Sequence, residues 1–145
     1  MDDQHWTPAR VEARLTDAAD VLQRLPDARA QGYFNTWPDF MRSFGDMVGQ
    51  APAPMRRPPP SPASIDEMDE ALNWLRWLEA DVTKIVWLRA SGERWKKICW
   101  EVGLQRTAVH QRYHFGHCVI TLRLNGQAPP RDCSRRRVIA MVQSG

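Results

Sequence analysis

Gly103 constrains the fold of this chain more than any other residue, because it separates two segments that both have a helical pattern. The surrounding stretch is RWKKICWEVGLQRTAVHQRY, residues 94–113. A helix that ends and turns sharply needs a left-handed residue after its last turn, and glycine takes that conformation without a steric penalty. The stretch therefore predicts a short helix from Arg94 to about Val102, a corner filled by Leu104, and a second helix that opens near Gln105 or Arg106.

The second helix has two contrasting faces when each residue is stepped by about 100°. One face is apolar and should be buried; it holds Val109, Tyr113, Gly116 and Ile120, widened by Ala108, Phe115, Val119 and Leu122. The opposite face is polar and should be exposed; it holds Thr107, His110, Gln111 and His114, flanked by Arg106 and Arg112.

The residue types on the polar face suit the edges of DNA bases. Gln can pair bidentately with adenine and Arg with guanine, while Thr can meet a thymine methyl or a phosphate. Lys96 and Lys97 of the preceding helix can hold phosphates while Ile98 and Val102 point inward. We therefore expect a DNA-binding site that comprises Lys96, Lys97, Arg106, Thr107, His110, Gln111, Arg112 and His114. The plainer alternative is a helical hairpin whose polar face meets only water.

The distribution of charge agrees with this expectation. The chain has a net charge of +3, but residues 83–145 hold twelve Lys and Arg against three acids, a net of +9. Residues 64–82 hold one Arg against six acids, a net of −5. The segment with the two-helix pattern is thus also the basic segment, as binding to phosphate requires. A solvated basic face is the alternative.

Two resemblances bear on these motifs. From Lys84 to Gly126, in IVWLRASGERWKKICWEVGLQRTAVHQRY, the order of features resembles the helix-turn-helix of sigma-factor region 4 and of related phage and bacterial regulators, which implies DNA binding. Such motifs usually have a small residue where Cys99 or Trp100 stands, so the first helix should be rotated or unusually packed. With WTPARVEARL, QGYFNTWP, PPPSPASIDEMDEALNWLRWLE and LRLNG, the whole chain also resembles an uncharacterised family of short alphaproteobacterial and phage proteins.

The segment 1–48 predicts N-terminal helices. Thr7 and Pro8 form a helix start, as cap and first helical residue. An apolar seam follows, which Pro26 closes; it consists of Val11, Leu15, Ala18, Leu22 and Leu25. The seam is too short for a free coiled coil, so it should pack within the chain, with a homodimer as the alternative. A second helix is expected from about Trp37 to Val48.

The segment 49–63 holds six prolines and predicts an extended linker. A helical domain should follow over 64–126. Its first helix should be capped by Ser64, with Glu67 completing a capping box, and should present an apolar side of Ile65, Met68, Leu72, Leu75 and Leu78. A break near Glu79 precedes an expected helix from Asp81 to Ala90.

The segment 127–145 predicts a flexible basic tail. Pro129 and Pro130 form a second linker, and Arg135, Arg136 and Arg137 precede VIAMV, which should form a short helix or strand that docks on the body or on a partner. This arginine cluster could bind DNA phosphate or simply solvate the tail. Taken together, the patterns predict an all-α fold.

The sequence has no motif that predicts an enzyme, a cofactor or a metal site. It lacks a glycine-rich phosphate loop, a GxSxG elbow and an HExxH or CxxC pattern. Potential zinc ligands do lie close in sequence, but the three histidines are better explained as a polar, partly protonatable groove surface; the set is Cys99, His110, His114, His117 and Cys118. No segment resembles a membrane span or a secretory signal, and the odd, sparse cysteines fit a reducing compartment, so we expect a cytoplasmic protein.

These patterns favour a sequence-directed protein that binds double-stranded DNA, of the kind found among bacterial or prophage transcriptional regulators. One alternative is a DNA-packaging subunit similar to a small terminase, which also joins a helix-turn-helix to oligomerising helices. Another is an interaction module that binds a protein such as RNA polymerase without DNA.

Overall fold

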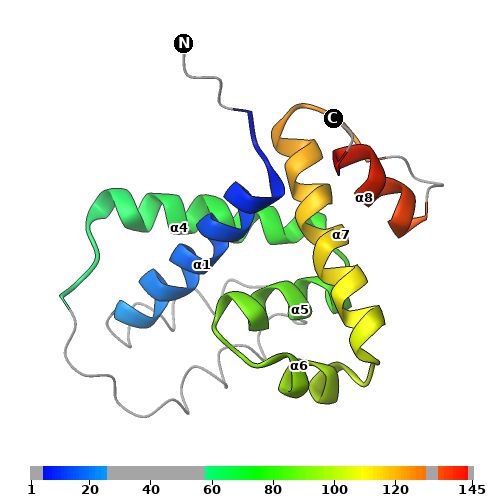
Figure 1. Cartoon of the computed structure of the whole chain (residues 1–145). Coiled ribbons are helices and arrows are strands. Elements are labelled where there is room, and N and C mark those ends of the chain that lie inside the picture. Colours follow the sequence, from blue (N-terminus) through cyan, green and yellow to red (C-terminus); the bar gives the residue numbers. More distant parts are fainter. Residues whose placement is uncertain (1–4, 26–57, 130–133, 144–145) are drawn as a thin grey trace.

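The computed structural model describes residues 5–25, 58–129 and 134–143, and within these ranges it contains six α-helices, one 3-10 turn and no strand (Figure 1). The predicted all-α fold is confirmed. The expected helix from Trp37 to Val48 and residues 49–57 of the expected linker lie outside the described residues. The elements are α1 Pro8–Arg24, α4 Pro62–Trp74, η1 Leu75–Trp77, α5 Ala80–Ala90, α6 Trp95–Val102, α7 Arg106–Leu124 and α8 Arg135–Gln143.

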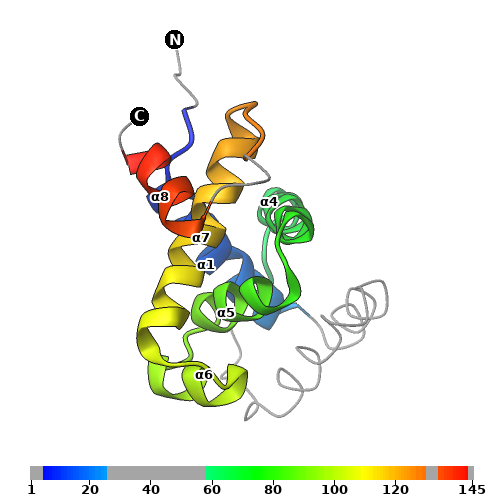
Figure 2. The ribbon, with the colours of Figure 1, turned by 90° about the vertical axis from the view of Figure 1, so that its right-hand side faces the viewer.

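α7 is the helix on which the other elements are assembled. It contacts α1, α5, α6 and α8 (Figures 1 and 2), and all seven residues from Gly116 to Leu122 are buried. A Cβ atom at Gly116 would lie 2.8 Å from Cγ1 of Val82 and 2.9 Å from Cγ2 of Val86. The missing side chain at this position therefore lets α5 approach the backbone of α7 closely.

α1 packs into the same core, which confirms the expectation that its apolar seam packs within the chain. The five seam residues are at most 6% exposed, and α1 contacts α4, α5 and α7. Its start is fixed as expected, because Thr7 Oγ1 accepts a hydrogen bond from the Arg10 amide at 3.3 Å and Pro8 is the first helical residue. The Trp6 amide also donates to Asn125 Oδ1 at 2.9 Å, and Asn125 Nδ2 donates to the Trp6 carbonyl at 3.0 Å, so the start of α1 is tied to the end of α7.

The predicted capping box at Ser64 is wrong. Ser61 caps α4 instead, since its side chain accepts a hydrogen bond from the Ser64 amide at 3.2 Å, and Pro62 occupies the first helical position. Proline is favoured there because its missing N–H has no partner in the first turn. Pro62 and Ala63 of the expected linker thus belong to α4. The predicted apolar side of this region is confirmed, with all five of its residues buried.

Residues 135–143 form the expected short helix that docks on the body, so the expectation of a flexible tail is wrong over this range. They form α8, which lies beside the C-terminal half of α7 in both views (Figures 1 and 2). Val138 is 1% exposed, and Ile139 and Val142 also pack against the core. Their helical spacing gives α8 an apolar stripe, and burying that stripe against α7 stabilises the helix.

Candidate nucleic-acid interface

The turn between α6 and α7 has the predicted geometry. Gly103 follows α6 with φ 69° and ψ 31°, in the left-handed region. The amides of Gly103 and Leu104 both donate to the Cys99 carbonyl, at 2.9 and 3.2 Å. Leu104 packs partly buried in the corner and α7 begins at Arg106, as predicted. The two helices are therefore held in a fixed relation by a tight connection.

The first turns of α7 present a polar surface to solvent, which we call the outer face of α7. Arg106, Thr107 and His114 are exposed and Gln111 is half-buried. Thr107, Gln111 and His114 are spaced by four and three residues, so they share one side of the helix. The outer face ends near His114, because α7 is buried from Gly116 to Leu122. It lies near α6, whereas α8 covers the other half of α7 (Figure 1).

His110 was expected on this face, but the structure places it between α6 and α7. Its ring centroid lies 4.2 Å from that of Trp95, and its Nε2 atom is buried without a hydrogen-bond partner among the described residues. The Arg89 guanidinium lies 4.7 Å from the same Trp95 ring. Burial, and then the charges of Arg106, His114 and Arg89, lower the pKa of His110. His110 is therefore a packing residue that helps to fix α7 against α6.

Arg112 was expected to face DNA, but its side chain is half-buried and paired with Asp81 of α5. Its Nε atom donates to Asp81 Oδ2 at 3.1 Å, and its side chain is only 19% exposed. The other carboxylate oxygen of Asp81 accepts the Val82 amide at 2.8 Å. Arg112 thus ties α7 to the first turn of α5, and its charge is largely compensated.

The remaining expected cations divide into paired and unpaired groups. Lys97 lies 3.3 Å from Glu93 and Arg135 lies 3.8 Å from Glu79, both in exposed pairs. Such surface pairs contribute little energy, so these cations can exchange their partners. Within the described residues, the exposed cations that belong to or directly precede α6, α7 and α8 and form no ion pair are Arg94, Lys96, Arg106, Arg123, Arg136 and Arg137. Arg123 lies in the last turn of α7, with its guanidinium 5.7 Å from the Trp77 ring. Arg94 was not among the expected site residues, although it precedes Lys96 and Lys97 in the same basic run.

His117 was expected on a polar groove surface, and that prediction is wrong. It is 4% exposed, and its Nδ1 donates to the Tyr113 carbonyl at 2.7 Å. Burial lowers the pKa of His117. Burial, followed by the nearby Glu12 carboxylate of α1, raises the pKa of the neighbouring Tyr113 phenol. These groups lie behind the outer face of α7 and join it to α1.

Stability should fall as the pH is lowered below about 6.5, the ordinary pKa of histidine. Because the pKa of buried His117 is lower than this value in the folded state, the unfolded chain binds more protons between the two values. We expect unfolding free energy to drop by up to about 1.4 kcal/mol per pH unit for such a group. Denaturant melts between pH 5 and pH 8 would measure it. His117→Gln should flatten the dependence, whereas His114→Gln at an exposed position should not; equal slopes in all three proteins would contradict this.

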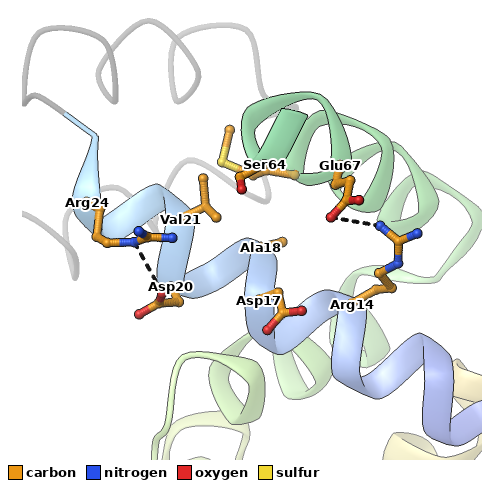
Figure 3. Close-up of a pocket in the computed structure, with 9 residues that line it drawn as sticks. Arg14, Asp17, Ala18, Asp20, Val21, Arg24, Ser64 and Glu67 are labelled. Atoms are coloured by element: carbon orange, nitrogen blue, oxygen red, sulfur yellow. Dashed lines mark ion pairs between the residues drawn. The ribbon is translucent and has the colours of Figure 1, made fainter. Parts of the chain in front are cut away.

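A hollow lies between α1 and α4, away from the outer face of α7 (Figure 3). Arg14 Nη1 lies 3.0 Å from Glu67 Oε2 across it, and Arg24 Nε lies 3.2 Å from Asp20 Oδ2 on one side of it. The Arg24 contact is close enough for an ion pair but lacks the alignment of a hydrogen bond. Acidic and basic groups thus face one another here, and we interpret the hollow as a polar seam that joins α1 to α4.

Within the described residues, no three His, Cys, Asp or Glu side chains are grouped as a metal site would require. None of the described helices is both long and apolar enough to cross a membrane.

The chain belongs to the family described as domain of unknown function DUF6362, whose model matches residues 23–120. The matched region contains α4, α5, α6 and most of α7. Comparison with curated proteins and with solved structures gives no match. The matched model is not that of a sigma factor or a helix-turn-helix family, so the resemblance to sigma-factor region 4 stays a hypothesis.

Proposed function

We propose that this protein binds double-stranded DNA in a sequence-directed manner, with the outer face of α7 in the major groove. The observation that carries the proposal is the exposure of Arg106, Thr107 and His114 on the first turns of α7, directly after the tight turn at Gly103. The major groove admits a single α-helix, and a recognition helix contacts base edges with its N-terminal residues. On this basis α6 and α7 act as a helix-turn-helix.

The cations near this face support the proposal. Arg94 and Lys96 lie at the start of α6, in position to contact phosphates on one side of the groove. Arg135, Arg136 and Arg137 begin α8, which packs on α7, and the Arg135 guanidinium lies 5.7 Å from the Phe115 ring. Arg136 and Arg137 are exposed. They would contact the DNA backbone beside the C-terminal half of α7. Such contacts supply affinity and position, whereas base contacts supply specificity.

We infer a regulator of transcription in preference to a packaging subunit. The packaging alternative needs helices that assemble subunits into a ring, and the apolar seam of α1 is occupied within its own chain. The remaining alternative is an interaction module that binds a protein such as RNA polymerase. It differs from the regulator and the packaging subunit because it requires no DNA. Sedimentation of the purified protein separates the first two, because a ring of many subunits favours packaging and a monomer or dimer favours the regulator.

Gln111→Ala or Arg106→Ala should weaken binding to a selected DNA site by about 1 to 3 kcal/mol and largely spare random DNA, because base-edge contacts carry discrimination. Lys96→Ala should weaken both duplexes alike, since a phosphate contact is independent of sequence. Fluorescence anisotropy on a selected duplex and a scrambled one measures both effects, with circular dichroism as the check on folding. If Gln111→Ala and Arg106→Ala bind both duplexes as the parent does, α7 is not the recognition helix.

A further inference from the structure

We propose that the outward side of α6 is a second nucleic-acid contact, which binds unpaired nucleotides by stacking a base on Trp100. This inference rests on the proposed function only in taking DNA as the ligand. It concerns a different helix and a different form of DNA from those read by the outer face of α7.

The exposure of the Trp100 side chain calls for an explanation. It is 81% exposed, whereas the other large apolar side chains exposed among the described residues, Trp77 and Met141, are 38% and 44% exposed. Ile98, which anchors α6 to the core, is fully buried. Two residues along a helix correspond to a turn of about 200°, so Trp100 projects away from the core. Most of the indole ring is thereby available to a ligand.

The surroundings of Trp100 are cationic. Lys96 precedes it by one helical turn, and Arg94, Lys96, Lys97 and Cys99 line an open hollow beside the ring. Arg94 and Lys96 form no ion pair among the described residues, while Lys97 is held by Glu93 at 3.3 Å. The surface therefore combines a flat apolar platform with charges that attract phosphate.

Unpaired nucleic acid fits both features at once. A single strand offers base faces for stacking and a phosphate for every base, and proteins that bind it combine aromatic platforms with basic grooves. A duplex fits less well, because its bases are stacked on one another and only their edges are accessible. An acidic protein surface would complement the cations but would need an apolar anchor for the ring. The observations favour DNA with an unpaired stretch.

The test compares two ligands and three variants of the full chain at one low salt concentration. Labelled oligo(dT) and a duplex of the same length are titrated with the parent protein, Trp100→Ala and Trp100→Phe. Trp77→Ala is the matched control, because Trp77 is also exposed and also has a cation, Arg123, 5.7 Å from its ring.

Trp100→Ala should weaken oligo(dT) binding by about 5- to 150-fold, the range expected from the loss of one stacked base. Its duplex affinity should change less than twofold, Trp100→Phe should retain most of the oligo(dT) affinity, and Trp77→Ala should bind as the parent does. Duplex binding without oligo(dT) binding, or equal oligo(dT) affinity for Trp100→Ala and the parent, overturns this inference alone. Binding of neither ligand overturns the proposed function as well. Capture of poly-glutamate in place of oligo(dT), lost in Trp100→Ala, would assign the surface to an acidic protein instead.

Discussion

Ile120→Asp should unfold the protein. Ile120 is fully buried in the segment of α7 on which α1, α5 and α8 pack. A carboxylate there would be removed from water without a cation to pair with, and an unpaired buried charge is among the most destabilising single changes. We expect a loss above about 4 kcal/mol, a large part of the total stability of an ordinary domain. Circular dichroism should show loss of the cooperative thermal transition.

The control for this variant is His114→Asp. It introduces the same carboxylate on the same helix, but at an exposed position. Its melting temperature should stay within a few degrees of the parent, as expected for surface substitutions. A cooperative melt of Ile120→Asp near that of the parent would contradict the assignment of α7 as the central buried helix.

The local elements of this fold could be predicted because local chemistry specifies them. Gly103 adopts the expected left-handed conformation, and the seam from Val11 to Leu25 is buried as its spacing predicts. The first follows from the backbone sterics of a helix end, and the second from the helical spacing of apolar residues, which shows which face packs on the core. The start of α4 was misplaced because two serines can each cap a helix here: Ser61 precedes a proline, and Ser64 lies three residues before Glu67. Only the cap geometry shows which serine accepts the amide.

The site was predicted less completely, because periodicity gives the direction of a side chain but not the neighbour that meets it. His110 projects sideways from α7, and only the position of Trp95 on α6 decides that it is packed. The partner of Arg112, Asp81, lies 31 residues away in sequence. His117 was expected on a polar groove surface, yet it is buried in the half of α7 that α8 lies beside. Long-range packing of this kind leaves no periodic signal in the sequence.

Trp100 is a large apolar residue that is exposed, in contrast to the polar residues that are buried. The resemblance to sigma-factor region 4 predicted that α6 would be rotated or unusually packed, since a small residue is usual near this position. α6 instead buries Ile98 and leaves the Trp100 ring in solvent. The large residue is accommodated by pointing away from the core.

Binding to duplex DNA should weaken steeply as salt is raised, because each phosphate contact releases counterions. Five of the exposed cations outside ion pairs are expected to contact phosphate, namely Arg94, Lys96, Arg106, Arg136 and Arg137, and they give a log-log slope of about −4.5, at about −0.9 for each contact. Between about 50 and 200 mM salt this slope corresponds to a loss of about 500-fold in affinity. If Lys97 and Arg135 leave their carboxylates for phosphate, the slope should approach about −6.

Single variants show which cations contribute to that slope. Lys96→Ala should make it shallower by about one contact, whereas Arg112→Ala should leave it unchanged, because Arg112 is paired with Asp81 and does not reach phosphate. Arg112→Ala should instead lower the melting temperature, since Asp81 loses its partner at the contact between α5 and α7. Anisotropy titrations of a labelled duplex at four or more salt concentrations give each slope. An affinity independent of salt would exclude this surface from DNA binding, and a shallower slope for Arg112→Ala would place its side chain at the interface instead of in the ion pair.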